Sequence, residues 1–114
     1  MDVIQSLINE MMNNAKLILY SRGGCCICEK LEERLKNISL NSLLPSLDLY
    51  VIDIDSDKVS NSERLRYDLE VPVMVVDFKE INTRFTLPRV SPRLKEEQLS
   101  LWLQKTINKL IEPN

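Results

Sequence analysis

The sequence predicts one α/β domain spanning residues 1–114, with its elements in the order β-α-β-α-β-β-α behind a helical extension. Three observations predict it. A chain of 114 residues can bury one hydrophobic core and is short for two. Hydrophobic residues make up 44% and charged residues 28%, which is typical of globular domains. Short apolar runs typical of strands alternate with segments whose apolar residues recur at helical spacing.

The first half of the chain contains the helical extension and a strand–helix–strand unit. Residues 1–14 are predicted to include an amphipathic helix, because their apolar side chains recur at helical spacing after Asp2, a suitable cap. The run KLILY at 16–20 is typical of a strand that is buried on both faces. Residues 26–37 combine regularly spaced apolar residues with many charged ones, which predicts a helix with one solvated face. A second strand is predicted at 47–54.

The second half of the chain supplies the remaining elements. A short helix is predicted at 61–69, and strands are predicted at 73–76 and 84–87. The polar residues 79–82 between these strands suit the turn of an antiparallel hairpin. Apolar residues at helical spacing over 99–111 predict the closing helix.

Composition excludes several classes of function. The 15 basic and 17 acidic residues give a net charge of -2, so we expect neither a nucleic-acid nor a membrane-surface partner. The apolar runs are far shorter than the roughly 18 residues of a membrane span. The first 13 residues contain no Lys or Arg, unlike a secretory signal, and we therefore expect a cytoplasmic protein. The chain has no histidine, which excludes Cys-His catalysis, Ser-His catalysis and histidine-containing metal sites.

All three cysteines and both glycines lie in one stretch, SRGGCCIC at 21–28. In a reducing compartment, such a cluster indicates catalysis or metal binding more than a structural disulfide. Adjacent Cys25 and Cys26 could pair only through a distorted peptide unit, and Cys26 and Cys28 would project to nearly opposite sides of a helix. Cys25 and Cys28 are neighbours on a helix surface, so the spacing favours a Cys25-x-x-Cys28 dithiol.

The position of this dithiol predicts different roles for its two cysteines. Cys25 lies where a strand ends and a helix begins, so unpaired amide N–H groups and the helix dipole favour its thiolate and make it an acidic nucleophile. Arg22 would add attraction to the same thiolate. Cys28 lies on the apolar side of the helix, which predicts a buried, slower resolving thiol. Gly23 and Gly24 would let the chain turn and bring another backbone segment close to the sulfur.

Two other interpretations of the cysteines remain open. A Cys-x-x-Cys pair also occurs as half of a zinc knuckle, but structural zinc normally needs more ligands than three thiols provide, so we expect no metal site within the chain. The cysteines could also fill space in the core. Their confinement beside both glycines favours the redox dithiol.

Over residues 15–111, the sequence resembles the thioredoxin-like superfamily and its short glutaredoxin-like members most closely. The segment Tyr20-Ser21-Arg22-Gly23-Gly24-Cys25 is similar to the pattern that precedes the glutaredoxin nucleophile, and Cys28 matches the resolving position. Glu70-Val71-Pro72-Val73 is similar to the second family motif, in which the proline is cis and faces the dithiol. The resemblance implies a thioredoxin fold with a four-stranded mixed sheet. It also implies that Arg22, Val71 and Pro72 contact the substrate.

The sequence departs from the glutaredoxin pattern at two points. Cys26 stands where glutaredoxins commonly have proline, which leaves the redox potential open. The resemblance implies glutathione as a co-substrate, held in part by a glycine pair after the cis-proline strand, yet no glycine follows Gly24. We expect side chains from Val76 to Lys79 to obstruct that site, and we therefore predict weak glutathione binding and no resident cofactor.

Three functions follow from these observations. The first is a monomeric thiol–disulfide oxidoreductase that acts on disulfide-bearing proteins through Cys25 and Cys28. The second is a metal or iron–sulfur carrier in which two chains share a cluster. The third is a non-enzymatic interaction module that binds a protein through the N-terminal helix or through a locally basic stretch. This stretch would suit an acidic partner, although a solvated face explains it as well. The stretch comprises Lys79, Arg84, Arg89, Arg93 and Lys95.

Overall fold

The computed structural model describes residue 3 and residues 14–111. The elements are β1 (Asn14–Ser21), α2 (Cys26–Asn37), β2 (Ser46–Asp53), α3 (Asn61–Tyr67), β3 (Val73–Phe78), β4 (Thr83–Thr86) and α4 (Glu96–Ile111). Single 3-10 turns lie at Leu40–Ser42 and Lys79–Ile81. This order confirms the prediction from the sequence. The predicted N-terminal helix lies outside the described residues, apart from residue 3 and Asn14, and Asn14 already belongs to β1.

The strands form one mixed sheet in the order β2-β1-β3-β4. β1 and β2 are parallel, and Ser21 pairs with Asp53 at their carboxyl ends. β3 runs antiparallel to β1, with Val73 opposite Tyr20. β4 returns antiparallel to β3 through the turn that the polar segment predicts. The turn includes Asn82, which has the left-handed conformation (φ 51°) that asparagine tolerates well. The result is the thioredoxin-like architecture that the sequence resemblance implied.

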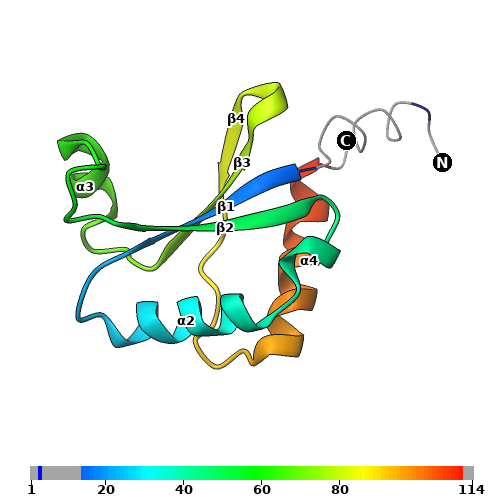
Figure 1. The fold of residues 1–114 in the computed structure, drawn as a ribbon, viewed down its shortest axis with the longest axis horizontal. Helices are drawn as coiled ribbons and strands as arrows, with labels where there is room; N and C mark the ends of the chain where they lie inside the picture. Colours follow the sequence, from blue (N-terminus) through cyan, green and yellow to red (C-terminus); the bar gives the residue numbers. More distant parts are fainter. Residues whose placement is uncertain (1–2, 4–13, 112–114) are drawn as a thin grey trace.

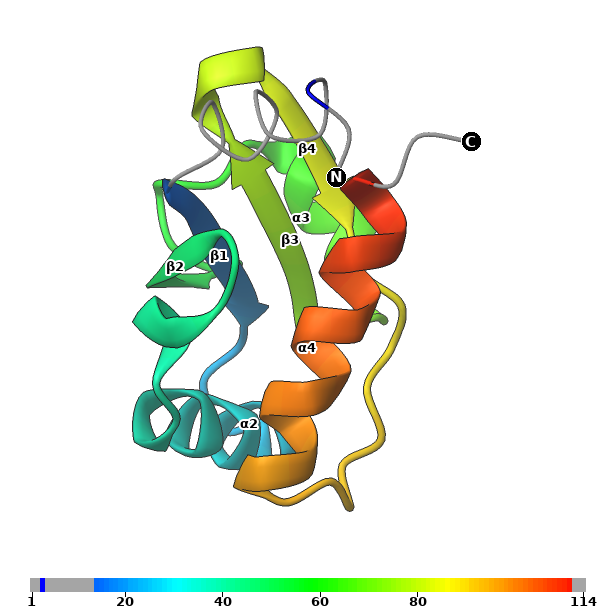
Figure 2. The ribbon, with the colours of Figure 1, turned by 90° about the vertical axis from the view of Figure 1, so that its right-hand side faces the viewer.

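The main core lies between one face of the sheet and the helices α2 and α4 (Figure 1). Figure 2 shows α4 running lengthwise along this face and meeting α2 near its first turns. Every second residue of a strand faces this core, because successive side chains of a strand point to opposite faces of the sheet. Its buried residues include Leu17 and Leu19 of β1, Leu35 of α2, Met74 and Val76 of β3, and Leu99, Leu103 and Ile107 of α4.

A smaller core covers one end of the opposite face. There Tyr67 of α3 stacks on Tyr20 of β1, with ring centroids 4.5 Å apart. The other end of this face is charged: Lys16, Asp77 and Arg84 are aligned across three strands, and Arg84 Nε lies 3.3 Å from Asp77 Oδ2. A seven-residue α3 is therefore enough to cover the apolar part of this face, which is the end that carries the dithiol.

Candidate functional site

The register of the sheet brings the two motifs of the sequence to the same end of the molecule. β1 ends at Ser21 and leads directly into the cysteine stretch. Because β3 is antiparallel to β1 and begins at Val73, opposite Tyr20, the residues just before β3 lie at that same end. The topology therefore places the Val71-Pro72 loop beside the end of the sheet from which the Cys25-x-x-Cys28 turn leaves.

Cys25 and Cys28 are joined in a disulfide, with their Cα atoms 5.2 Å apart. This is the pairing that their spacing predicts. Cys28 is buried against the core at 1% exposure, Cys25 is partly exposed, and Cys26 is exposed with a free thiol. The difference in exposure gives the two cysteines of the disulfide different access to a substrate: Cys25 faces solvent and Cys28 does not.

Cys25 caps the amino end of α2. Its backbone is extended (φ -89°, ψ 105°), and its Sγ accepts a hydrogen bond from the Cys28 amide N–H at 3.2 Å. This N–H is one of the first-turn donors that have no partner within the helix. In the reduced protein, the same donor and the helix dipole would stabilise a thiolate at Cys25. The local structure thus supports Cys25 as the reactive thiol.

A tight turn positions this cap. The Cys25 N–H donates to the Arg22 carbonyl oxygen at 3.2 Å, and Gly24, the third residue of the turn, has φ +81°. A positive φ at that position is what a type II turn requires. A Cβ built on Gly23 or Gly24 meets no atom of another segment within 4 Å, so neither glycine is needed to make room for a neighbouring backbone at its own position. The turn needs a glycine at position 24 because of the positive φ there. At position 23 there is room for a side chain.

The two glycines provide a matched pair of variants for this turn. We expect Gly24→Ala to lower the free energy of unfolding by about 1–2 kcal/mol, the cost of a left-handed conformation with a Cβ. Gly23→Ala adds the same methyl group where nothing obstructs it, and its effect should be within about 0.5 kcal/mol. Urea denaturation of both variants measures the difference. Equal losses in the two variants would show that the positive φ of Gly24 does not limit the turn.

Arg22, which the sequence analysis expected to attract the Cys25 thiolate, is bound to two carboxylates. Its guanidinium donates to both carboxylate oxygens of Asp55, at 2.9 and 3.2 Å, and to the carboxylate and the carbonyl oxygen of Asp68. The bonds to Asp55 and Asp68 raise the pKa of Arg22, and the bond from Arg22 holds the pKa of Asp55 below its ordinary value. Arg22 therefore joins the segment after β1 to the segments after β2 and α3, and its charge is already balanced.

The Val71-Pro72 peptide bond is cis. The side chains of these two residues lie in different surroundings. Pro72 lines a groove beside α2, whereas the side chain of Val71 packs against the smaller core on the opposite face. The Val71 amide N–H donates to the Tyr67 carbonyl oxygen at 3.1 Å, so this donor already has a partner inside the protein.

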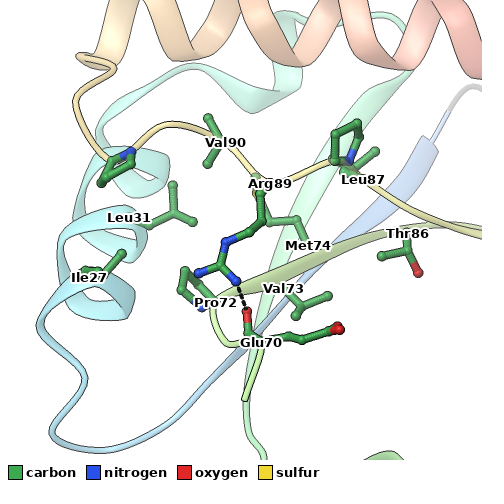
Figure 3. Close-up of a pocket in the computed structure, with 12 residues that line it drawn as sticks. Ile27, Leu31, Glu70, Pro72, Val73, Met74, Thr86, Leu87, Arg89 and Val90 are labelled. Atoms are coloured by element: carbon green, nitrogen blue, oxygen red, sulfur yellow. Dashed lines mark hydrogen bonds between the residues drawn. The ribbon is translucent and has the colours of Figure 1, made fainter. Parts of the chain in front are cut away.

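Pro72 lines a groove at this end of the molecule (Figure 3). Its volume is about 270 Å³. One wall is α2, through Ile27 and Leu31, and the other is the segment between β4 and α4. Neither Cys25 nor Cys28 lines it, but Ile27 lies between them in the chain and is 48% exposed. The remaining lining residues are Glu70, Val73, Met74, Thr86, Leu87, Pro88, Arg89, Val90 and Pro92.

Arg89 is the site residue that sequence reasoning missed, because it was assigned only to a basic stretch. In the β3–β4 pairing, Val75 lies opposite Thr86, so extending the register by three residues places Arg89 opposite Pro72. Arg89 Nη1 donates to the Glu70 carbonyl oxygen at 3.2 Å (Figure 3). The predicted hairpin already indicated that Arg89 lies near Pro72, because an antiparallel hairpin brings together residues that are equally far from its turn.

The same register shows that the segment beside the dithiol end of the sheet is not the predicted one. Val76–Lys79 was expected to obstruct a glutathione carboxylate there. Lys16 pairs with Asp77, so this segment lies at the opposite end of the sheet, and Val76 and Phe78 are buried in the main core. Residues 86–90 take its place beside Pro72. Lys79 and Arg84 of the predicted basic stretch therefore lie far from the groove, and only its later members lie near it.

Comparison with known proteins identifies the family. The model of the glutaredoxin-like domain (DUF836) matches residues 16–104, which is most of the chain. The chain belongs to this glutaredoxin-like family. None of the curated proteins matches it. Among solved structures, the structural genomics target XcR50 from X. campestris is 22% identical with a TM-score of 0.45, covering 78% of this chain and 96% of that one. A malarial protein is 12% identical with a TM-score of 0.53, covering 82% and 98%, and this likeness supports the fold alone.

Within residues 14–111 and residue 3, no three or more Cys, Asp or Glu side chains come together in a way that could hold a metal ion. None of the helices in the described part of the chain has the length and apolar character needed to cross a membrane.

Proposed function

We propose that this glutaredoxin-like protein is a thiol–disulfide oxidoreductase that reduces disulfides in protein substrates, with Cys25 as nucleophile and Cys28 as resolving thiol. The observation that carries the proposal is the asymmetry of the dithiol. Cys25 is partly exposed, and its sulfur accepts the Cys28 amide N–H, whereas Cys28 is buried. A thiolate with a fixed N–H donor and access to solvent is the arrangement that thiol–disulfide exchange requires.

In the reduced protein, the Cys25 thiolate attacks one sulfur of the substrate disulfide. A new S–S bond forms to Cys25, the substrate S–S bond breaks, and the second substrate sulfur leaves as a thiolate. Cys28 then loses its proton to solvent and attacks the Cys25 sulfur. This step forms the Cys25–Cys28 disulfide and releases the first substrate sulfur as a thiolate. Two electrons pass from the dithiol to the substrate, and an external thiol reductant restores the dithiol.

The groove beside Pro72 supports a polypeptide substrate. Ile27 and Leu31 from α2 and Pro72 from the loop before β3 give it an apolar lining, and Ile27 lies between the two cysteines in the sequence. An extended substrate segment attached through its cysteine to Cys25 could lay an apolar side chain against this lining. In this proposal the protein works as a monomer in a reducing compartment such as the cytoplasm, because its dithiol must be re-reduced after each cycle.

The proposal is tested by dithiothreitol-driven reduction of a protein whose native disulfides are accessible, measured as the release of substrate thiols. We expect the rate to exceed that of dithiothreitol alone and to rise in proportion to the concentration of the protein. Protein that has been reduced and then alkylated with iodoacetamide is the control, and it should add nothing. A rate equal to that of dithiothreitol alone, across several substrate proteins, would reject the oxidoreductase function.

A further inference from the structure

The groove beside Pro72 continues along α2 and carries an excess of positive charge. A second hollow of about 120 Å³ shares Ile27, Leu31 and Pro72 with the first and adds Lys30 and Arg34. The charged side chains along the combined groove are Lys30, Arg34 and Arg89, against Glu70 as the one acidic residue among the lining residues. The groove is therefore apolar along its walls and cationic at its margins, although the whole chain is slightly acidic.

Arg89 differs from the other arginines of the site in its partners. Arg22 is held by Asp55 and Asp68, and Arg34 Nη1 donates to the carbonyl oxygens of Pro92 and Leu94. Among the residues that the structure describes, Arg89 forms no ion pair, and its hydrogen bond is the single one to the Glu70 carbonyl oxygen.

The guanidinium of Arg89 also has a suitable position. Figure 3 shows it extending from the segment after β4 toward the Glu70 carbonyl, beside Pro72, while the side chain of Glu70 extends away from it. A guanidinium offers several N–H donors in a planar fork that matches a carboxylate. One of them is used here. The others border a groove lined by apolar side chains, where a carboxylate would be less hydrated than on an open surface.

We propose that Arg89 makes this groove selective for acidic protein segments: substrates whose reactive cysteine is accompanied by an apolar residue and by an Asp or Glu that binds the Arg89 guanidinium. This inference rests on the proposed oxidoreductase function and adds the class of substrate. The apolar residue packs against Ile27 and Pro72, which line the groove from different elements. Lys30 adds attraction from the α2 side, because it lines the adjoining hollow and forms no ion pair among the described residues.

Charge complementarity at Arg89 affects the choice between substrates more than it raises the affinity for any one of them. An ion pair at an exposed margin changes rates by about two- to fivefold and weakens with salt. A lysine at the same place in the substrate would meet Arg89 and Lys30 with like charge. We therefore expect a graded preference, acidic over neutral over basic, which disappears as ionic strength rises.

The test uses peptides with a single cysteine carried as a mixed disulfide with 2-thiopyridine, which absorbs when released. Each peptide has one fixed leucine and either Glu, Gln or Lys, with this variable residue moved through the positions on both sides of the cysteine. The second-order rate of thiopyridine release from the pre-reduced protein is measured at low salt and at high salt. For the best position, we expect the Glu peptide to react about two- to fivefold faster than its Gln counterpart at low salt, and equally fast at high salt.

Arg89→Ala should bring the Glu-to-Gln rate ratio to one, and Arg89→Glu should favour the Lys peptide. Arg93→Ala is the matched control: it removes the same charge from the same segment, but Arg93 lines neither hollow, and the ratio should be kept. The ratio is independent of any general loss of activity in a variant. Equal wild-type rates for all three residues, or a ratio that Arg93→Ala lowers as much as Arg89→Ala, would overturn the inference. A wild-type protein that releases no thiopyridine from any peptide would instead contradict the oxidoreductase function itself.

Discussion

Replacing Cys25 with serine should lower disulfide reduction to the rate of the reductant alone, whereas replacing Cys28 with serine should leave a stable covalent complex with the substrate. Cys25 is the partly exposed thiol at the helix start, so without it no nucleophile reaches the substrate. Loss of the nucleophile should lower the rate that the protein adds by a factor on the order of a thousand or more. Without Cys28, the mixed disulfide on Cys25 has lost its resolving thiol, because adjacent Cys26 could pair with Cys25 only through a distorted peptide unit.

Non-reducing gel electrophoresis after incubation with a disulfide-bonded substrate measures the complex. Cys28→Ser should give a band at the combined mass that disappears with excess dithiothreitol, and Cys25→Ser should give none. Cys26→Ser is the matched control, because Cys26 is adjacent, exposed and outside the disulfide, and this variant should turn over as the wild type does. A complex that forms through Cys26, or turnover that needs Cys26 and survives the loss of Cys25, would show that Cys25 is not the nucleophile.

The sequence predicts the fold well because its strongest signals are local. KLILY is too apolar for an exposed strand, and the regular spacing from Ile27 to Leu35 suits only a helix that packs on a sheet. The same locality explains the Cys25–Cys28 pairing, since residues three apart at a helix start are neighbours in any fold. Within residues 14–111, the predicted helices and strands differ from the observed ones at their ends: β3, for example, continues to Phe78, and α4 begins at Glu96.

The sequence predicts the site less well because ion pairs and grooves depend on the register between distant segments. Arg22 lies 33 residues from Asp55 and 46 from Asp68, and nothing local indicates that these carboxylates hold it. Arg89 becomes a site residue only when β4 is paired with β3. Val71 is predicted to contact the substrate, and the direction of its side chain and the partner of its N–H depend on where α3 ends.

These contacts bear on the electron donor. The resemblance implies that Arg22 and the backbone near the cis-proline hold glutathione. Here Arg22 is already held by two carboxylates, and the Val71 N–H already donates to Tyr67. Residues 86–90, with their own side chains, border the groove where the resemblance implies glycines. Each charge-assisted hydrogen bond that cannot form costs about 1.5–3 kcal/mol, or about ten- to a hundredfold in affinity.

We therefore expect glutathione-dependent reduction of a small mixed disulfide to be weak or absent, while dithiothreitol-driven reduction of a protein disulfide proceeds. The assay compares the two reductants at equal thiol concentration, following glutathione disulfide formation in one case and substrate thiols in the other. The Asp55→Asn, Asp68→Asn double variant should raise the glutathione-dependent rate, because it frees the Arg22 guanidinium from both ion pairs. Rapid glutathione-coupled turnover in the wild type that survives Cys28→Ser would contradict this expectation, since only Cys25 is needed to exchange a glutathione mixed disulfide. It would mean that glutathione reaches Cys25 without the help of Arg22 or of the Val71 N–H.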